Sequence, residues 1–286
     1  MCGGTLETLK ALKRLQEHCK VVIFVTNTTS ESRSALLEKV QSLGLSVSED
    51  CIFSSLSAAA DLVRTRKRRP FLLLKDAAKE EFPDLIQTEK IPLDSPLPTE
   101  GDRLDTVVVG LAPQYFSEEF QTAALRILLK EDAQLIAVHK GRTYQAKDGL
   151  HIGPGALVSG LEFSTGKKAE VVGKPSRAFF DAAILRAEAV MKQRFGDSDE
   201  REGGGPESSL AVDRKRVVMI GDDARDDVKG AIAAGLNGLL VRTGKYREGE
   251  EKRAGLLNEN GQPLTGFLGT AENFSAAVDC LLLGHT

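Results

Sequence analysis

Polar side chains that could bind a phosphate group stand at two points of the sequence. Thr26 and Asn27 come directly after the apolar run Val21–Val25, and their hydroxyl and amide groups can donate hydrogen bonds to an anion. Lys174 stands before Pro175, a residue that suits the first turn of a helix. Its ammonium group would then lie beside a positive helix terminus, which is a favourable place for a phosphate.

Aspartates that could bind a cation crowd the end of a later apolar run. Asp222, Asp223, Asp226 and Asp227 all follow the run Val217–Ile220. Carboxylates this close repel one another unless a cation is present, and Mg²⁺ prefers oxygen ligands of this kind. The cluster therefore predicts a magnesium site.

Each of these groups also has a common structural explanation. A Thr-Asn pair after a strand often forms a turn, and the aspartates could cap a helix and interact with its dipole. A single Lys-Pro pair is a weaker signal still. The combination is more specific than its parts, because all three groups follow apolar strands and ligands of open α/β sheets bind at the carboxyl ends of strands.

Strands and helices alternate in the sequence pattern on both sides of a different middle segment. Helices are predicted from residue 6 to about 15, after Ser30 with Gly44 as the C-terminal cap, from about Ser176 to Phe195, and through Val228 to Gly235. Continuous apolar strands are predicted at 21–25, 217–220 and 239–241. This alternation predicts an α/β fold with a doubly wound parallel sheet.

The middle segment is predicted to be a separate α/β module inserted into that core. Strands are predicted at 71–74, 107–109 and 135–138, with a Pro-rich acidic stretch at 91–105 and a glycine-rich turn at 149–155. We therefore predict a core formed by residues 1–58 and 167–286, and an inserted domain at 59–166. Residues 196–209, rich in Gly, Glu, Asp and Ser, are predicted to be a disordered insertion within the core.

The composition excludes several classes of protein. The 38 Lys and Arg residues nearly balance the 41 Asp and Glu residues, which argues against a nucleic-acid-binding protein. The four cysteines are too scattered for a zinc cluster or a disulfide framework. No apolar stretch suits a signal peptide or a membrane span. A soluble, cytoplasmic protein is the expectation. The basic stretch 64–69 is either a polyanion-binding patch or the solvated end of a helix.

Three segments together resemble motifs two, three and four of the haloacid dehalogenase (HAD) superfamily. They are Phe24–Ser32, Val172–Pro175 and Met219–Val228, with further support from Gly110–Pro113, Ala137–Lys140 and Thr243–Tyr246. The resemblance implies a Rossmann-like core with a cap domain inserted between motifs two and three. It also implies a Mg²⁺-dependent phosphatase that acts through an aspartyl-phosphate.

The resemblance assigns phosphate-binding and catalytic roles by motif. Thr26 and Asn27 would hold the oxygens of the transferred phosphoryl group, while Lys174 would neutralise phosphate charge and orient the nucleophile. These roles suit phosphoryl transfer, in which positioning and charge neutralisation supply most of the catalysis.

It also assigns the metal site by motif. Asp222 would bind Mg²⁺ directly, Asp227 would support the metal shell, and Asp223 and Asp226 would assist them.

Cap residues are expected to select a small phosphorylated substrate. The candidates are His139 and Lys140, together with Arg142 and Tyr144, although His139 could equally be a strand-end residue that binds no ligand. No nucleic-acid or membrane partner is expected. Capped relatives of this group often form homodimers, which makes a homodimer the oligomer to test first.

The first motif of the superfamily, which supplies the nucleophilic aspartate, is missing upstream of Thr26. Asp76 and Asp148 are poor substitutes, because Asp76 lies in a segment that matches the cap and Asp148 follows no buried strand. We therefore expect this chain, as written, not to form the covalent intermediate. A truncated reading frame, a splice variant and a pseudoenzyme would each explain the gap.

Two further expectations follow from that gap. The removal of a central strand would let strand 21–25 pair directly with strand 217–220. The alternative function is a non-catalytic protein that binds phosphate and Mg²⁺ or serves as an interaction scaffold.

Overall fold

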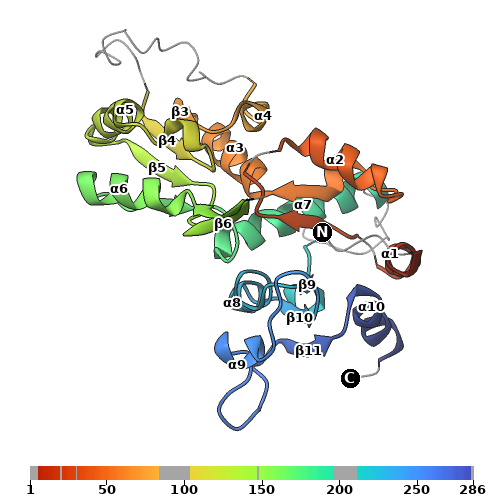
Figure 1. Ribbon diagram of the computed structural model, residues 1–286. Helices are drawn as coiled ribbons and strands as arrows, with labels where there is room; N and C mark the ends of the chain where they lie inside the picture. Colours follow the sequence, from red (N-terminus) through yellow and green to blue (C-terminus); the bar gives the residue numbers. More distant parts are fainter. Residues whose placement is uncertain are drawn as a thin grey trace. The chain divides into compact units, whose positions relative to one another are not determined.

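The computed structural model describes residues 6–19, 21–29, 31–83, 104–146, 148–195 and 211–284. Helices and strands alternate along the chain, as the α/β prediction requires (Figure 1). The predicted disordered insertion at 196–209 and nearly all of the acidic stretch 91–105 lie outside the described residues. None of the described helices has the length and apolar character of a membrane span.

The chain divides into two compact units. The first contains Met1–Val25, Leu37–Phe53 and Lys174–Thr286, and the second contains Thr26–Leu36 and Ser54–Gly173. The division into a core and an inserted cap domain with the boundaries given above stays a prediction.

A parallel four-stranded sheet lies at the centre of the second unit. In spatial order its strands are β3 (Pro70–Leu73), β4 (Thr106–Val109), β5 (Gln134–Ala137) and β8 (Glu170–Val171). The predicted strands at 71–74, 107–109 and 135–138 are confirmed, with shifts of about one residue. Their uninterrupted apolar runs are explained by burial, because β3 and β4 are buried along their whole lengths.

Helices complete the core of the second unit. They are α3 (Ser55–Thr65), α4 (Asp76–Lys79), α5 (Glu118–Leu128) and α6 (Gly155–Thr165). Residues such as Ile127 of α5 and Val158 of α6 share one hydrophobic cluster with strand residues such as Val107. An antiparallel hairpin joins β6 (Thr143–Ala146) and β7 (Gly149–Ile152). The predicted turn at 149–155 is therefore wrong over β7, which pairs with β6 despite its glycine.

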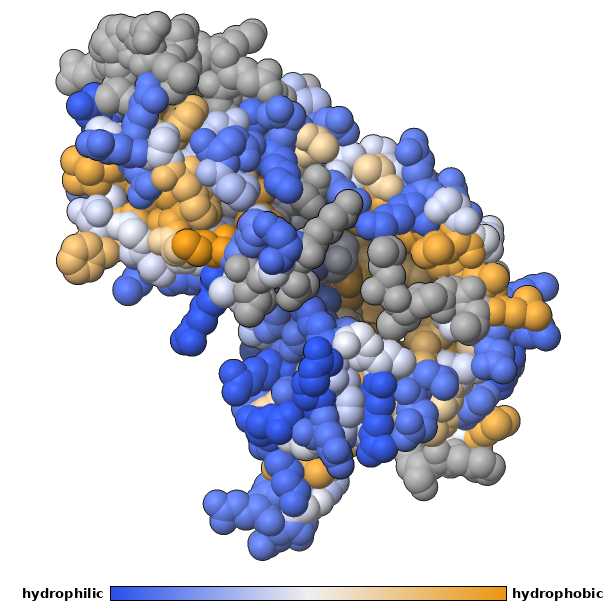
Figure 2. Space-filling model, in the orientation of Figure 1, coloured by the Kyte–Doolittle hydropathy of each residue, from blue (hydrophilic) through white to orange (hydrophobic). Residues whose placement is uncertain are grey.

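The first unit is built on a parallel three-stranded sheet. In spatial order its strands are β11 (Phe267–Ala271), β10 (Asn237–Val241) and β9 (Val218–Gly221). Its helices are α1 (Leu6–His18), α7 (Arg177–Phe195), α8 (Gly230–Ala233), α9 (Glu250–Arg253) and α10 (Phe274–Leu283). The predicted first helix and the long helix after Ser176 are confirmed. Hydrophilic residues predominate on the visible face around α9 (Figure 2).

The first strand of the chain does not have the predicted partner. Strand β1 (Phe24–Thr26) pairs with β2 (Ile52–Ser54), and β9 pairs with β10 in a different sheet. The expected direct pairing of strands 21–25 and 217–220 is therefore wrong. Strands β1 and β9 therefore lie in separate sheets, and each pairs with a strand that follows it in the chain. Helix α2 (Arg33–Ser42) follows β1, and Gly44 adopts the positive φ of 83° that a C-terminal cap requires.

Candidate functional site

A buried ion pair lies near the carboxyl end of β9. The Nζ atom of Lys174 lies 2.6 Å from Oδ1 of Asp227, and the two side chains are 9% and 7% exposed. Lys174 also donates a hydrogen bond of 3.4 Å to the carbonyl oxygen of Val25, the residue before Thr26. Each charge of such a buried pair loses its hydration, so the two charges must lie in close contact to compensate for that loss.

A π-helical turn, η5 (Ala224–Lys229), brings the Asp227 side chain back to the end of β9. Asp223 caps this turn and accepts hydrogen bonds of 3.1 Å and 2.9 Å from the N–H groups of residues 225 and 226. The N–H of Asp223 in turn donates to Oδ2 of Asp227 at 3.2 Å. A Cβ atom on Gly221 would lie 2.3 Å from that oxygen, so only glycine fits there. Turns with this wider winding often occur at functional sites, and here it replaces the first part of the predicted regular helix.

The loop after β10 holds the side chain of Asp222 in place. Oδ2 of Asp222 accepts a hydrogen bond of 2.7 Å from the backbone N–H of Lys245, and Nζ of Lys245 lies 3.2 Å from Oδ2 of Asp223. Gly244 has a φ of 55°, and a Cβ atom there would lie 2.0 Å from Oδ2 of Asp222. Lys245 is a site residue that was not predicted from the sequence, where Thr243–Tyr246 only supported the resemblance. Its position just after the apolar run of β10 was the available signal.

The aspartates of the cluster have different electrostatic surroundings. Burial raises the pKa of Asp226, and the neighbouring Asp223 carboxylate raises it further. Burial would also raise the pKa of Asp223, but the hydrogen bond from the Asp226 N–H and the charge of Lys245 lower it overall. The carboxylates therefore differ in how well neighbouring groups stabilise their negative charge. The charged form of Asp226 is the one that its surroundings disfavour.

The donor chemistry at this point fits Mg²⁺. The available side-chain atoms are carboxylate oxygens, which are the hard ligands that this ion prefers. Within the described ranges, no group of three or more His, Cys, Asp or Glu side chains is arranged to hold a metal ion. Mg²⁺ is commonly bound through one or two carboxylates while it retains several waters, so a complete protein cage is not required.

Two of the three predicted phosphate-binding residues, Thr26 and Asn27, belong to the second unit. Thr26 ends β1, and Asn27 follows it. A Cβ atom on Gly173 would lie 2.9 Å from Oδ1 of Asn27, so the glycine lets the backbone approach that amide closely. The structure thus brings Lys174 together with the four aspartates in the first unit, while Thr26 and Asn27 are placed in the second.

The predicted substrate-selecting residues also lie in the second unit: His139, Lys140 and Arg142 stand between β5 and β6, and Tyr144 lies in β6. A cavity of about 460 Å³ is lined by Lys140, Arg142, Gly155, Ala156 and Ser159. Lys140 forms an ion pair with Glu162, and its hydrogen bond to that carboxylate lowers the pKa of Glu162. The predicted His139 does not line this cavity; its Nδ1 accepts a hydrogen bond of 3.0 Å from the N–H of Gly141.

The basic stretch 64–69 is engaged in contacts within its own unit. Arg64 pairs with Asp61, Arg66 with Glu170, and Arg68 with Asp105. Helix α3 ends at Thr65, so the stretch is the end of a helix and the turn that follows it. These ion pairs favour the structural interpretation of the stretch over a polyanion-binding patch.

Comparisons with known proteins agree with the resemblance of the motifs. A family described as haloacid dehalogenase-like hydrolase matches residues 6–85, and one described as HAD-hydrolase-like matches residues 171–263. Haloacid dehalogenase-like hydrolase domain-containing protein 2 of Bos taurus is 41% identical over 273 residues, which cover 96% of this chain and 87% of that protein.

Two phosphatases are also similar to the chain. Phospholysine phosphohistidine inorganic pyrophosphate phosphatase of Homo sapiens is 31% identical over 98% of this chain and 88% of that protein. The structure of a p-nitrophenyl phosphatase from Archaeoglobus fulgidus superimposes with a TM-score of 0.74 and 26% identity, covering 96% of this chain and 92% of that one. The chain therefore belongs to the haloacid dehalogenase-like hydrolases, a family with phosphatase members, and has their α/β fold.

Proposed function

We propose that this chain carries the phosphate-binding and Mg²⁺-binding parts of a phosphatase that acts on small phosphomonoesters. The observation that carries the proposal is the buried Lys174–Asp227 pair beside the aspartates at the end of β9. It combines a cation for phosphate charge with carboxylates for a metal. Membership of a hydrolase family with phosphatase members supports the same assignment.

Each residue would contribute through charge or hydrogen bonding. Thr26 and Asn27 would donate hydrogen bonds to phosphoryl oxygens, and the Lys174 ammonium would neutralise the charge on them. Asp222 and Asp227, with Asp223 beside them, would hold Mg²⁺, which when bound supplies further neutralisation of phosphate charge.

The substrate is proposed to be small and to carry its own negative charge besides the ester phosphate. Support comes from Lys140 and Arg142, two basic residues that line the cavity beside the start of α6. His139 does not line it, which leaves Lys140 as the better supported of the two predicted selectors. A cytoplasmic location and a homodimer belong to the same proposal.

The sequence as written offers no aspartate that matches the nucleophile of the family. We propose that the residues named above bind phosphate and Mg²⁺, and that turnover also requires a nucleophilic aspartate of the kind that the family's first motif supplies. A non-catalytic protein that binds phosphate and Mg²⁺ is the second candidate function.

Hydrolysis of p-nitrophenyl phosphate with Mg²⁺ separates the two functions. The assay compares this chain with a version extended upstream in the genomic reading frame. Turnover by the extended protein alone would support the phosphatase. No turnover by either protein, with both folded and both binding Mg²⁺, would favour the non-catalytic function.

Mg²⁺ binding is tested by calorimetric titration of this chain and two variants. Asp222→Asn is expected to weaken the affinity at least about 10-fold, since a charged ligand is lost. Glu259→Gln is the matched control, because Glu259 is an exposed carboxylate of the same unit. Equal affinities for all three proteins would contradict the proposed metal site.

A further inference from the structure

We propose that Glu81 is a positioning residue for the segment Thr26–Thr29. The proposal rests on the function proposed above, which assigns phosphate binding to the start of this segment. Glu81 follows helix α4, and it is 7% exposed. A carboxylate buried to this degree requires hydrogen-bond partners, and the identity of those partners shows what Glu81 holds in place.

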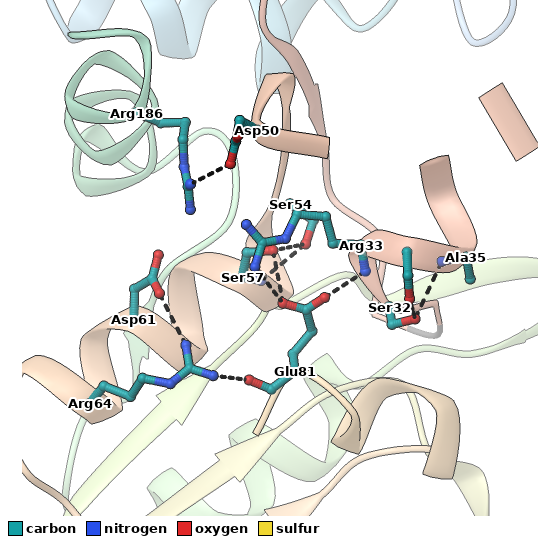
Figure 3. Close-up of polar contacts among 11 residues, drawn as sticks. Ser32, Arg33, Ala35, Asp50, Ser54, Ser57, Asp61, Arg64, Glu81 and Arg186 are labelled. Carbon is teal, nitrogen blue, oxygen red and sulfur yellow. Dashed lines mark hydrogen bonds and ion pairs between the residues drawn. The ribbon is translucent and has the colours of Figure 1, made fainter. Parts of the chain in front are cut away.

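The Glu81 carboxylate contacts the start of two helices (Figure 3). Oε1 accepts a hydrogen bond of 2.5 Å from the backbone N–H of Arg33, the first residue of α2. Oε2 accepts one of 3.3 Å from the hydroxyl of Ser57, in the first turn of α3, and lies 3.8 Å from Nη2 of Arg33. One buried side chain therefore fixes the beginning of α2 to the beginning of α3.

Glu81 is itself held firmly enough to serve as an anchor. Its backbone carbonyl accepts a hydrogen bond from the guanidinium of Arg64, near the end of α3. Arg64 is oriented in turn by an ion pair of 3.2 Å with Asp61. Main chain and side chain of Glu81 are thus fixed to opposite ends of α3, as Figure 3 shows.

The positive end of α2 is occupied by groups of the protein. Besides the bond from Arg33 to Glu81, the N–H of Ala35 donates to the hydroxyl of Ser32 at 3.4 Å. The Glu81 carboxylate takes the favourable position for a negative charge at this helix terminus. The start of α2 thereby serves as an anchor for the preceding loop. In the proposed function it is therefore the loop, and not the helix end, that binds the anion.

The loop between β1 and α2 is fixed at further points by the same unit. The hydroxyl of Ser55 donates to the carbonyl of Thr28 at 3.1 Å, and the N–H of Leu111 donates to the hydroxyl of Thr29 at 3.4 Å. Thr29 is buried, with 4% exposure. The hydrogen bond between Glu81 and Arg33 holds the end of the loop where α2 begins. Its loss would remove the contact that holds the helix end of the loop, and small displacements of positioned groups weaken ligand binding and catalysis strongly.

The experiment compares Glu81→Ala with Glu80→Gln in the full chain. Glu80 is the adjacent, exposed carboxylate and provides a matched control. Backbone hydrogen exchange is measured over residues 26–36, and the affinity for inorganic phosphate is measured with Mg²⁺ present. We expect Glu81→Ala to exchange at least about 10-fold faster in this segment and to bind phosphate about 3- to 10-fold more weakly. Glu80→Gln should match the unmodified chain in both. If Glu81→Ala does not fold, Glu81→Gln, which keeps the volume and one acceptor, is measured instead.

Unchanged exchange would overturn the proposal, and so would faster exchange with unchanged phosphate affinity. Thr26→Ala separates this failure from failure of the proposed function. If Thr26→Ala weakens phosphate binding and Glu81→Ala does not, only the role of Glu81 is wrong. If neither Thr26→Ala nor Glu81→Ala changes phosphate binding, or the unmodified chain binds none, the phosphate-binding function of the segment is wrong, and the role of Glu81 fails with it.

Discussion

Replacing Lys174 by Met should destabilise the protein far more than a typical surface substitution. The change removes the ammonium group and retains most of the volume of the side chain. Asp227, which is 7% exposed at its side chain, would then be a buried carboxylate without its cation. A further carboxylate, that of Asp226, lies close enough to Asp227 to interact with it electrostatically.

The expected magnitude follows from the geometry of the pair. Two unit charges 2.6 Å apart attract each other by about 6 kcal/mol at an effective dielectric constant of about 20. The cost of removing both charges from water offsets most of that attraction in the intact pair, but it is not recovered for the charge that remains. Loss of one partner from a buried pair typically costs about 3–5 kcal/mol. We expect Lys174→Met to lower the free energy of unfolding by about 3 kcal/mol without Mg²⁺.

Urea unfolding followed by circular dichroism measures this loss. With a slope of about 2 kcal/mol per molar urea, the midpoint should move by about 1.5 M. The double variant Lys174→Met, Asp227→Asn should regain much of the loss, with a coupling energy of about 2 kcal/mol. Mg²⁺ at ten times its dissociation constant should restore about 1.4 kcal/mol to the single variant.

Two results would refute this reasoning. A loss below about 1 kcal/mol for Lys174→Met would mean that Asp227 is well hydrated without its partner. Additive effects in the double variant would mean that the short contact between the two side chains contributes no interaction energy.

Two further predictions concern Gly244 and Glu162. Gly244→Ala should destabilise the protein by more than about 1–2 kcal/mol and weaken Mg²⁺ binding, because its Cβ would collide with Asp222. The control is Gly261→Ala, which is also at positive φ but has no atom within 4 Å of the added Cβ, so it should lose stability and keep its Mg²⁺ affinity. Equal Mg²⁺ affinity in both variants would contradict the prediction. The hydrogen bond from Lys140 lowers the pKa of Glu162 below its ordinary 4.5. The ion pair between the two residues therefore stabilises the folded protein fully near neutral pH, and this contribution is lost as the pH falls below 4.5 and Glu162 becomes protonated. Glu162→Gln should therefore cost up to about 1 kcal/mol at pH 7 and less at pH 3.5, measured by urea unfolding, and a constant difference across that range would count against the ion pair.

Local pattern was sufficient to find several of the described strands and to point to candidate site residues. The buried strands β3, β4 and β10 could be predicted because residues that lose contact with water on both faces form uninterrupted apolar runs. The crowding of the aspartates after β9 predicts a cation site, and that site stays a prediction. These features are encoded within a few neighbouring residues, so a single sequence reveals them.

Long-range contacts escaped prediction because partners distant in sequence leave no local pattern. The pairing of β1 with β2 in place of β9 depends on which backbone edges meet after folding. The contacts of Lys245 with Asp222 and Asp223 and the burial of Glu81 against the start of α2 are also long-range.

The sequence by itself thus determined the family, the α/β class and the residue types available for phosphate and metal binding. The tertiary structure alone decided that Lys174 is neutralised by Asp227 and that the start of α2 is held by Glu81. The physical reason is that burial removes competing water, so a charge must take the nearest partner that folding brings to it.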